Sequence, residues 1–399
     1  MKLLKKGVKK LIVSIVICAF LTPTFSYSDD NNRVDKFSKS SILIDQLTGR
    51  VLYEKEADAK RPLASLSKMM TFLLAIEAIE EGKVKKDDII TVDKSIAKVR
   101  GSSYHLKEGE KIPLIELMKG LMIVSGNDAA VAIAKHIKGS EEEFVKSMNE
   151  KCIELGMTNT HFVNPHGLPI YDLNDKTKPP KENISSARDI AKLGKFMFDN
   201  YEKQVVSITN MRTYSYPERD FCKNNTNSAL MSTSPNVDGI KTGYTGNAGY
   251  CLSFSMMVKE DNNNEKEHRL IGVTLGANHK QKRLSAAISM LNYGKENFST
   301  QKVMDKNKLI GKKYIKGIDE LEIKLVTNKE LYTILSKEEK LKSQITFKEI
   351  KYPVKKGDVL GVIKYFTDSG EVLGSVNIVS DNDIDKVSFK NRIKMIFAD

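Results

Sequence analysis

Three short motifs that combine hydroxyl and amine side chains occur in order along the chain. They are Ser65-Leu66-Ser67-Lys68, Ser125-Gly126-Asn127 and Lys241-Thr242-Gly243. Each motif alone is a common surface sequence, whereas the ordered set is rare by chance. A serine hydroxyl becomes a good nucleophile when a neighbouring base takes its proton, and helical spacing places Lys68 one turn after Ser65. The set therefore predicts a serine nucleophile, Ser65, with an amine base, Lys68.

Lys68 can act as a base only if its pKa is lowered, because an ordinary lysine is protonated at about pH 7. Burial and a second cation would lower that pKa, and Lys241 is the candidate cation. Ser125 supplies a second hydroxyl, which can pass a proton between the two lysines and a leaving amine. Asn127 can hold Lys68 or a substrate amide. We therefore expect Ser65, Lys68 and Ser125 to be catalytic.

The third motif is suited to binding a substrate. Lys241 and Thr242 offer a charge and a hydroxyl to a carboxylate, on an edge strand whose backbone can pair with an extended peptide. Gly243 allows close approach of the substrate. The oxyanion formed on acylation needs two fixed donors, and the simplest pair is the backbone N–H groups of Ser65 and Tyr244. The residues expected to bind substrate are Asn127, Lys241, Thr242, Gly243 and Tyr244.

The sequence around these motifs resembles the D-alanyl-D-alanine carboxypeptidases, the low-molecular-mass penicillin-binding proteins. The resemblance covers nearly the whole chain after residue 28. The matching stretches are Ala64–Thr71, Ser125–Ala129, Asn164–Leu168 and Asp238–Thr245. The resemblance implies an enzyme that removes the terminal D-alanine from peptidoglycan stem pentapeptides through an acyl-enzyme on Ser65, which water then resolves. It also implies acylation of the same serine by β-lactams, and no metal or organic cofactor.

The resemblance adds one binding residue, because Arg283 matches a family arginine that helps to hold the terminal carboxylate. Two positions depart from the family pattern. Tyr244 stands where some relatives carry histidine, and Ser67 replaces a frequent threonine. For two other polar residues near the motifs we expect structural roles. His166 should make structural hydrogen bonds rather than act as a base or metal ligand, and Asp128 should cap the following helix.

Three other functions use similar residues. A class A β-lactamase shares the motifs but activates the deacylating water with a Glu-x-x-Leu-Asn loop, and no such pentapeptide occurs between Asn127 and Lys241. A peptidoglycan D,D-endopeptidase would use the same residues on a larger leaving group, and the sequence does not separate it from a carboxypeptidase. A non-catalytic wall-binding or β-lactam-sensing protein would have lost a motif residue, and none is missing.

The first 28 residues are typical of a signal peptide. Five lysines precede the apolar run Leu11–Leu21, which is too short to span a bilayer permanently. Removing residues 1–28 lowers the formal net charge from +13 to about +8. We therefore expect an exported protein at the cell wall or the outer face of the cytoplasmic membrane. No basic run is interleaved with aromatic residues, which argues against nucleic-acid binding.

Three cysteines remain after this processing, at positions Cys152, Cys222 and Cys251. An odd number in a long chain argues against a disulfide framework. Cys152 shares a helical face with Phe144 and Met148, which predicts a buried thiol. The sequence does not decide whether Cys222 and Cys251 form a disulfide bridge.

The spacing of apolar residues predicts one α+β domain for residues 33–300. The resemblance implies that this is the serine carboxypeptidase domain, with the antiparallel sheet and helical cluster of the penicillin-binding and β-lactamase-like transpeptidase fold. Strands are expected at Ser41–Asp45, Arg50–Tyr53, Val237–Lys241, Gly249–Val258 and Leu270–Gly276. Helices are expected at Ser65–Gly82, Leu114–Val124, Asp128–Ile137, Ser140–Gly156, Ser186–Phe198 and Arg283–Phe298. Because early and late strands flank the helical block, both ends of this region should contribute to one sheet.

Residues 301–385 predict a small β-rich domain. Alternating runs occur at Leu321–Leu325, Ile345–Phe347, Val359–Phe366 and Val372–Val379, and Asp368-Ser369-Gly370 is typical of a hairpin turn. No catalytic set occurs there, which favours a spacer or docking role. Residues 386–399 mix bulky apolar and basic side chains. A peripheral membrane contact through this tail is one expectation, and a frayed end is the other.

Overall fold

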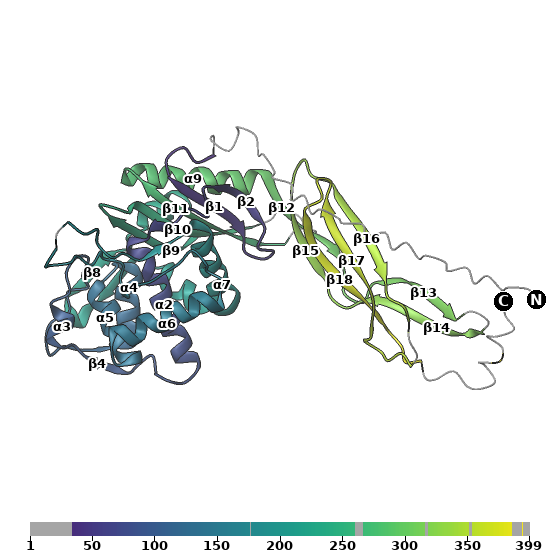
Figure 1. The fold of residues 1–399 in the computed structure, drawn as a ribbon, viewed down its shortest axis with the longest axis horizontal. Coiled ribbons are helices and arrows are strands. Elements are labelled where there is room, and N and C mark those ends of the chain that lie inside the picture. Colours follow the sequence, from purple (N-terminus) through teal and green to yellow (C-terminus); the bar gives the residue numbers. More distant parts are fainter. Residues whose placement is uncertain are drawn as a thin grey trace, which may run out of the picture.

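The computed structural model describes residues 34–175, 177–259, 266–315, 318–350, 353–384 and residue 393. The expected signal peptide and nearly all of the expected tail lie outside these residues. Within them the chain forms two bodies, a larger one of sheet and helices and an elongated one of strands (Figure 1). No helix in the described ranges is long and apolar enough to cross a membrane.

A five-stranded antiparallel sheet forms the centre of the larger body, with the strand order β2-β1-β11-β10-β9. Its strands are β1 Ser40–Asp45, β2 Val51–Lys55, β9 Val237–Thr245, β10 Gly249–Val258 and β11 His268–Ala277. β1 pairs with β11, and Ile42 lies opposite Val273. An early strand therefore lies beside a late one, and the predicted antiparallel α+β fold is confirmed.

Side chains alternate along β1 and so enter two different cores. Ile42 and Ile44 pack with the helical cluster, whereas Leu43 packs with Met290 of α9 (Lys280–Asn297) on the other side. Figure 1 shows α9 along one face of the sheet and the other large helices on the opposite face. The sheet is therefore buried on both faces.

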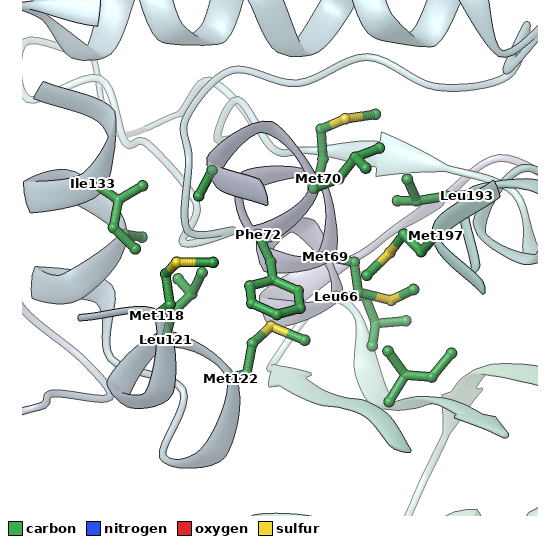
Figure 2. Packing of buried hydrophobic residues seen from close by; sticks show 14 of the residues in the cluster. Leu66, Met69, Met70, Phe72, Met118, Leu121, Met122, Ile133, Leu193 and Met197 are labelled. Atoms are coloured by element: carbon green, nitrogen blue, oxygen red, sulfur yellow. The ribbon is translucent and has the colours of Figure 1, made fainter. Parts of the chain in front are cut away.

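The helical cluster has one helix at its centre. Its members are α2 Lys68–Glu80, α4 Leu114–Ile123, α5 Asn127–Lys138, α6 Glu141–Glu154 and α7 Ala187–Thr209. α2 is buried along most of its length, as expected for a helix that is apolar on nearly all sides. Figure 2 shows Phe72 of α2 pointing toward Met118 and Met122 of α4, while Met69 lies near Met197 of α7. The residues at the start of α2 are thereby held at the centre of the fold.

α7 is longer than predicted. The polar residues Asp199 and Asn200 interrupt its apolar pattern, so the prediction ended at Phe198. The structure instead has a kink at Tyr201, whose φ is −137°, and the helix then continues to Thr209. The buried side chains after the kink show that the apolar face resumes there.

α9 begins earlier than predicted. Its N-cap is His279, whose Nδ1 accepts a hydrogen bond from the backbone N–H of Gln281 at 3.2 Å. Arg283 therefore lies one turn inside the helix and does not open it. The first turn is polar, so it gave no apolar signal in the sequence.

Several short elements complete the larger body. They are η1 Ala64–Ser67, α3 Lys94–Ala97, η2 Pro217–Arg219, α8 Ser228–Thr233, β3 Arg61–Pro62, β4 Ile89–Thr91, β5 Lys111–Pro113, β6 Ile184–Ser185, β7 Thr213–Tyr216 and β8 Phe221–Asn224. The short strands form the antiparallel pairs β3 with β6, β4 with β5 and β7 with β8. Ser140 caps α6, because its hydroxyl accepts a hydrogen bond from the N–H of Glu143 at 3.2 Å.

The elongated body is built from strands. β12 Phe298–Met304 pairs with β15 Leu331–Ser336, and a five-stranded sheet has the order β13-β14-β18-β17-β16. The sheet strands are β13 Leu309–Ile315, β14 Ile318–Thr327, β16 Leu341–Phe347, β17 Val359–Thr367 and β18 Val372–Ser380. The predicted turn around Gly370, whose φ is 93°, joins β17 to β18. The expected β-rich character is confirmed, although β12, β13 and β15 were not predicted.

Arg50 links the two bodies. Its guanidinium donates hydrogen bonds to Glu339 at 2.8 Å, to Glu371 at 2.7 Å and to the backbone oxygen of Ile334 at 2.8 Å. Arg50 immediately precedes β2, Glu339 lies between β15 and β16, and Glu371 lies between β17 and β18. One cation therefore joins the sheet of the larger body to two turns of the elongated body.

Candidate active site

Ser65 and Lys68 lie at the start of the central helix α2. Ser65 belongs to the 3-10 turn η1, and Lys68 is the first residue of α2 and is fully buried. The Nζ atom of Lys68 lies 2.9 Å from the Oγ atom of Ser65. Side chains on a helix point back toward its N-terminus, which brings the amine over the preceding turn.

Two further oxygens surround the amine of Lys68. Its Nζ atom donates to Oδ1 of Asn127 at 2.7 Å and to the backbone oxygen of His166 at 2.8 Å. The amide of Asn127 is oriented by its Nδ2 atom, which donates to the backbone oxygen of Arg100 at 2.7 Å. Both oxygens can only accept, so a neutral amine directs its two N–H groups to them and its lone pair to Ser65. This arrangement suits removal of the serine proton.

The electrostatic surroundings favour a neutral Lys68. Burial lowers its pKa well below the ordinary lysine value, and the positive charge of Lys241 lowers it further. The negative charge of Asp128 acts in the opposite direction. Burial and the charge of Arg283 lower the pKa of Lys241 to about 7. Burial and a second cation, the two causes expected from the sequence, are therefore both present.

Ser125 lies in the short loop between α4 and α5, as predicted. Its backbone has a φ of 67°, in the left-handed region that non-glycine residues rarely adopt. Its Oγ atom is buried and has no hydrogen-bond partner among the described residues. A buried hydroxyl without a partner is costly, so strain and an unused hydrogen bond meet at this loop. Both are common where a substrate group completes the site.

The Asn164–Leu168 loop closes the site behind η1. Oδ1 of Asn164 accepts a hydrogen bond from the N–H of Gly167 at 2.6 Å. A Cβ atom on Gly167 would lie 1.9 Å from the backbone oxygen of Ala64, and the φ of Gly167 is +93°. Only glycine fits there. Sequence reasoning gave Gly167 no role, although a glycine directly after Pro-His in a loop was a signal for a tight turn.

His166 has the structural role that was expected. Burial and then the charge of Lys68 lower its pKa to about 3, so the ring is neutral at physiological pH. Its Nδ1 atom accepts a hydrogen bond from the N–H of Leu168 at 3.1 Å. Its backbone oxygen, rather than its ring, contacts Lys68.

Lys241, Thr242 and Gly243 lie on β9, the edge strand of the sheet. Lys241 is buried, and its Nζ atom donates to the backbone oxygen of Thr242 at 3.1 Å. A Cβ atom on Gly243 would lie 3.0 Å from the backbone oxygen of Leu63 and 3.2 Å from the nitrogen of Ser65. The missing side chain at Gly243 therefore makes room for η1, whereas we had expected it to make room for substrate.

These elements enclose a cleft with a volume of about 290 Å³. It is lined by Ser65, Ser102, Ser125, Thr226, Thr242, Gly243, Tyr244, Tyr250, Lys280 and Arg283. Six of the nine predicted site residues line it, and Lys68, Asn127 and Lys241 are buried beside it. Sequence reasoning missed Ser102, Thr226, Tyr250 and Lys280, which belong to no motif and are brought to the cleft by folding alone.

One end of the cleft is aromatic and cationic. The ring of Tyr244, which is 56% exposed, lies 4.3 Å from the ring of Tyr250 between centroids. Arg283 reaches β10, the strand of Tyr250, from α9, and its Nη1 atom donates to the backbone oxygen of Cys251 at 3.4 Å. A carboxylate could be held there by the guanidinium and the neighbouring hydroxyl of Thr242.

Asp128 does not cap α5 as expected. The helix begins at Asn127 with Gly126 as its N-cap, so Asp128 lies inside the first turn. Its carboxylate instead accepts hydrogen bonds from the backbone of Tyr104 at 2.8 Å and of Leu106 at 3.1 Å. The pattern of the sequence around the second motif did not reveal this long-range contact.

The three cysteines in the described ranges are free thiols. Cys152 is buried, as predicted from its helical face. Cys251 is buried on β10, whereas Cys222 is exposed on β8, and no bridge joins them. Among the residues that the structure describes, no group of histidine, cysteine or acidic side chains is arranged to hold a metal ion.

Fold and site together define a class of protein, a serine hydrolase in which a buried lysine faces the serine. A family model described as D-alanyl-D-alanine carboxypeptidase matches residues 28–279, and one described as the C-terminal domain of penicillin-binding protein 5 matches residues 298–386. The chain is 35% identical over 369 residues to the D-alanyl-D-alanine carboxypeptidase DacF of Bacillus subtilis, covering 90% of each chain. The chain belongs to the D-alanyl-D-alanine carboxypeptidase family.

Solved structures show the same relationship. Penicillin-binding protein 5 from Haemophilus influenzae matches with a TM-score of 0.74 and 29% identity, over 88% of this chain and 98% of that one. Penicillin-binding protein D2 from Listeria monocytogenes, solved in a cefotaxime-bound form, matches with a TM-score of 0.56 and 26% identity. The second match covers 64% of this chain and 96% of that one.

Proposed function

We propose that the protein is a serine-type D-Ala-D-Ala carboxypeptidase that removes the terminal D-alanine from peptidoglycan stem pentapeptides through an acyl-enzyme on Ser65. The single observation that carries this proposal is the geometry of Lys68. Its amine lies 2.9 Å from Ser65, and its other two contacts are oxygens that can only accept. The family matches supply the substrate class.

In the proposed acylation step, Oγ of Ser65 attacks the carbonyl carbon between the two D-alanines while Lys68 takes the hydroxyl proton. The negative oxygen that forms is stabilised by the backbone N–H groups of Ser65 and Tyr244. Ser125 passes this proton from Lys68 to the nitrogen of the leaving D-alanine and the C–N bond breaks, which returns Lys68 to its neutral form. Water then attacks the ester carbon, which releases the shortened peptide and restores the Ser65 hydroxyl.

Substrate binding is proposed to use the edge of β9 and the cationic end of the cleft. The peptide backbone would pair with β9, and its terminal carboxylate would contact Thr242 and Arg283. Lys241 is buried beside Thr242 and contributes charge to this region. The side-chain amide of Asn127 already accepts a hydrogen bond from Lys68 and donates one to the backbone oxygen of Arg100, so we assign Asn127 to holding Lys68.

The proposed organisation follows the matched family regions. Residues 1–28 act as a signal peptide, residues 33–300 form the carboxypeptidase domain and residues 301–385 form a β-rich spacer. Residues 386–399 are proposed to contact the membrane surface peripherally. The protein would then act outside the cytoplasm, at the cell wall or the outer face of the cytoplasmic membrane, on stem peptides and as a target of β-lactams.

The test offers purified protein a peptide ending in D-Ala-D-Ala and follows free D-alanine with time. Steady release that is absent from a Ser65→Ala variant supports the proposal. Rapid hydrolysis of penicillin without release of D-alanine would favour a β-lactamase. Cleavage of a cross-linked dimer faster than of the pentapeptide would favour an endopeptidase, and no turnover of any of the three would favour a non-catalytic penicillin sensor.

A further inference from the structure

One wall of the cleft is a strained loop. Ser102 lines the cleft, and the residues beside it include Gly101 with a φ of 87° and His105 with a φ of 61°. Left-handed backbone at a non-glycine residue costs free energy and persists only when neighbouring groups hold it. We call Ser102–Leu106 the wall segment. The groups that hold the wall segment in this conformation are therefore important for the shape of the cleft.

Asp128 holds the wall segment from the side of the second motif. Its Oδ1 atom accepts from the backbone N–H of Tyr104 at 2.8 Å, and its Oδ2 atom accepts from Oγ of Ser103 at 2.7 Å and the N–H of Leu106 at 3.1 Å. A fourth bond, from the N–H of Ala129 at 2.9 Å, fixes the carboxylate on α5. All four donors are neutral, and no ion pair to this carboxylate occurs among the residues that the structure describes.

The neighbouring residue continues the same attachment. The backbone N–H of Asn127 donates to the backbone oxygen of Ser102 at 2.8 Å, and its Nδ2 atom donates to the oxygen of Arg100 at 2.7 Å. Asn127 also contacts Lys68. The wall segment, the second motif and the amine of Lys68 are therefore connected through two consecutive residues at the start of α5.

Arg219 also holds the wall segment, through different backbone groups. Its Nη1 and Nη2 atoms donate to the backbone oxygens of Tyr104 at 3.2 Å and His105 at 2.9 Å. Its guanidinium lies 4.3 Å from the ring centroid of Tyr104 and forms an ion pair with Glu110. Arg219 thus donates to carbonyl groups of the wall segment, and Asp128 accepts from its N–H groups. The two residues differ in charge, and Asp128 follows directly after Asn127, which contacts Lys68.

The charge of Asp128 acts on the proposed base. The positive charge of Lys241 on β9 acts on Lys68, the charge of Arg283 on α9 acts on Lys241, and the ring of His166 is neutral. Against these cations the negative charge of Asp128 favours the protonated amine. A carboxylate at this place therefore limits how far burial can lower the proton affinity of Lys68.

We propose that Asp128 is a positioning residue of the acylation site, which fixes the wall segment against the second motif and supplies negative charge that acts on Lys68. The proposal rests on the proposed function, because it assigns a part in acylation of Ser65. It assigns Arg219 only the first of these two tasks. The two residues therefore form a matched pair for experiment.

The test measures the rate of acylation by a fluorescent penicillin at a series of pH values for wild type, Asp128→Asn and Arg219→Ala, with circular dichroism to check folding. Asparagine cannot accept from all four donors, so both variants should loosen the wall segment and slow acylation by roughly 10-fold to 10²-fold. In Asp128→Asn alone the acid limb of the pH profile should move to lower pH, by roughly one unit. Neutralising Asp128 removes a charge that favours protonated Lys68, which is why the shift is downward.

A Ser103→Ala variant keeps the test decisive if Asp128→Asn does not fold. It removes one bond to the carboxylate and leaves the charge, so acylation should slow while the acid limb stays in place. Folded Asp128→Asn with the rate and limb of wild type would overturn the inference, as would equal limb shifts in Asp128→Asn and Arg219→Ala. Wild-type protein that forms no adduct would instead overturn the proposed function.

Discussion

The side chain of Asn127 joins the first two motifs, because its Oδ1 atom accepts a 2.7 Å hydrogen bond from Nζ of Lys68. Together with the backbone oxygen of His166, 2.8 Å away, it occupies two of the directions in which the amine can donate. The third direction leads to Ser65. The orientation of the amine is therefore set by groups that take no part in bond breaking.

Replacing Lys68 with alanine should abolish most acylation, because the hydroxyl of Ser65 then has no base. We expect a fall of roughly 10² to 10⁴ in the rate of labelling by a fluorescent penicillin. The fold should persist, because the apolar side chains of α2, such as Met69 and Phe72, keep the helix packed in the core. The matched control is Lys94→Ala, an exposed lysine at the start of α3, which should label normally. Undiminished labelling of folded Lys68→Ala would remove Lys68 from the mechanism.

Replacing Lys241 with methionine should stabilise the protein in a pH-dependent way. The pKa of Lys241 is about 7 in the folded state, whereas an unfolded lysine titrates at about 10.4. Between these values the unfolded chain binds more protons, so the stability of the wild type rises with pH. Below pH 7 the cost of the buried ammonium is present in full.

The gain from Lys241→Met should therefore be largest below a pH of about 7 and should shrink as the pH approaches the ordinary lysine range. Its size below that value should be a few kcal/mol, since a tenfold change in a protonation equilibrium corresponds to about 1.4 kcal/mol. Urea unfolding at low and high pH measures it, with Lys94→Met as control. A gain that does not depend on pH would contradict burial of a titrating amine.

A Gly167→Ala substitution should damage the site more than its size suggests. The added methyl group would lie 1.9 Å from the backbone oxygen of Ala64, at a φ of +93°. The loop must move away from η1, which displaces the oxygen of His166 that contacts Lys68. We expect a loss of more than ~2 kcal/mol of stability, together with slow acylation. Gly139→Ala, also at positive φ but with open space around it, is the matched control and should keep normal acylation.

Replacing Arg50 with alanine should weaken the junction between the two bodies without affecting acylation. Burial alone would raise the pKa of Glu339, but hydrogen bonds from Arg50 and the backbone of Ser336 outweigh it and lower that pKa. The contribution of this pair is therefore present above the ordinary carboxylate pKa and is lost as the pH falls through the lowered value.

The measurement for Arg50→Ala is urea unfolding at neutral pH, with solution scattering to follow the shape. Hydrogen bonds to a charged partner contribute about 1.5–3 kcal/mol, so a loss in that range is expected. Arg188→Ala breaks exposed pairs with Glu54 and Asp58 inside the larger body and should cost at most about 1 kcal/mol. Equal effects of the two variants would show that the junction is not held by Arg50.

The fold was largely predictable where local periodicity carries the signal. The alternation around Ile42 and the apolar run of α4 gave the right elements, and early strands were correctly expected to join late ones. α7 and α9 were misjudged at their polar stretches, Asp199–Asn200 and Lys280–Lys282. In α7 the buried residues after the kink extend the helix, whereas in α9 the side chain of His279 caps an exposed polar first turn that has no apolar signal.

The contacts of the candidate site also divide into local ones, which the sequence predicts, and long-range ones, which it does not. Ser65 and Lys68 are one helical turn apart, so their contact follows from local geometry. The bond from Lys68 to Asn127 and the space that Gly243 leaves for η1 depend on how distant segments pack. The part of Ser102 in the cleft and the attachment of Asp128 to Tyr104 depend on the same packing. Motifs therefore identify the reacting groups, and only the structure identifies what holds them.

The acyl-enzyme on Ser65 is tested most directly by mass spectrometry. Purified protein is incubated with a penicillin, digested and searched for the mass of the bound drug on each peptide. We expect one adduct, on the peptide that carries Ser65, and none on the Ser65→Ala variant. An adduct on a different residue, or no adduct on folded wild-type protein, would contradict the proposed acyl-enzyme.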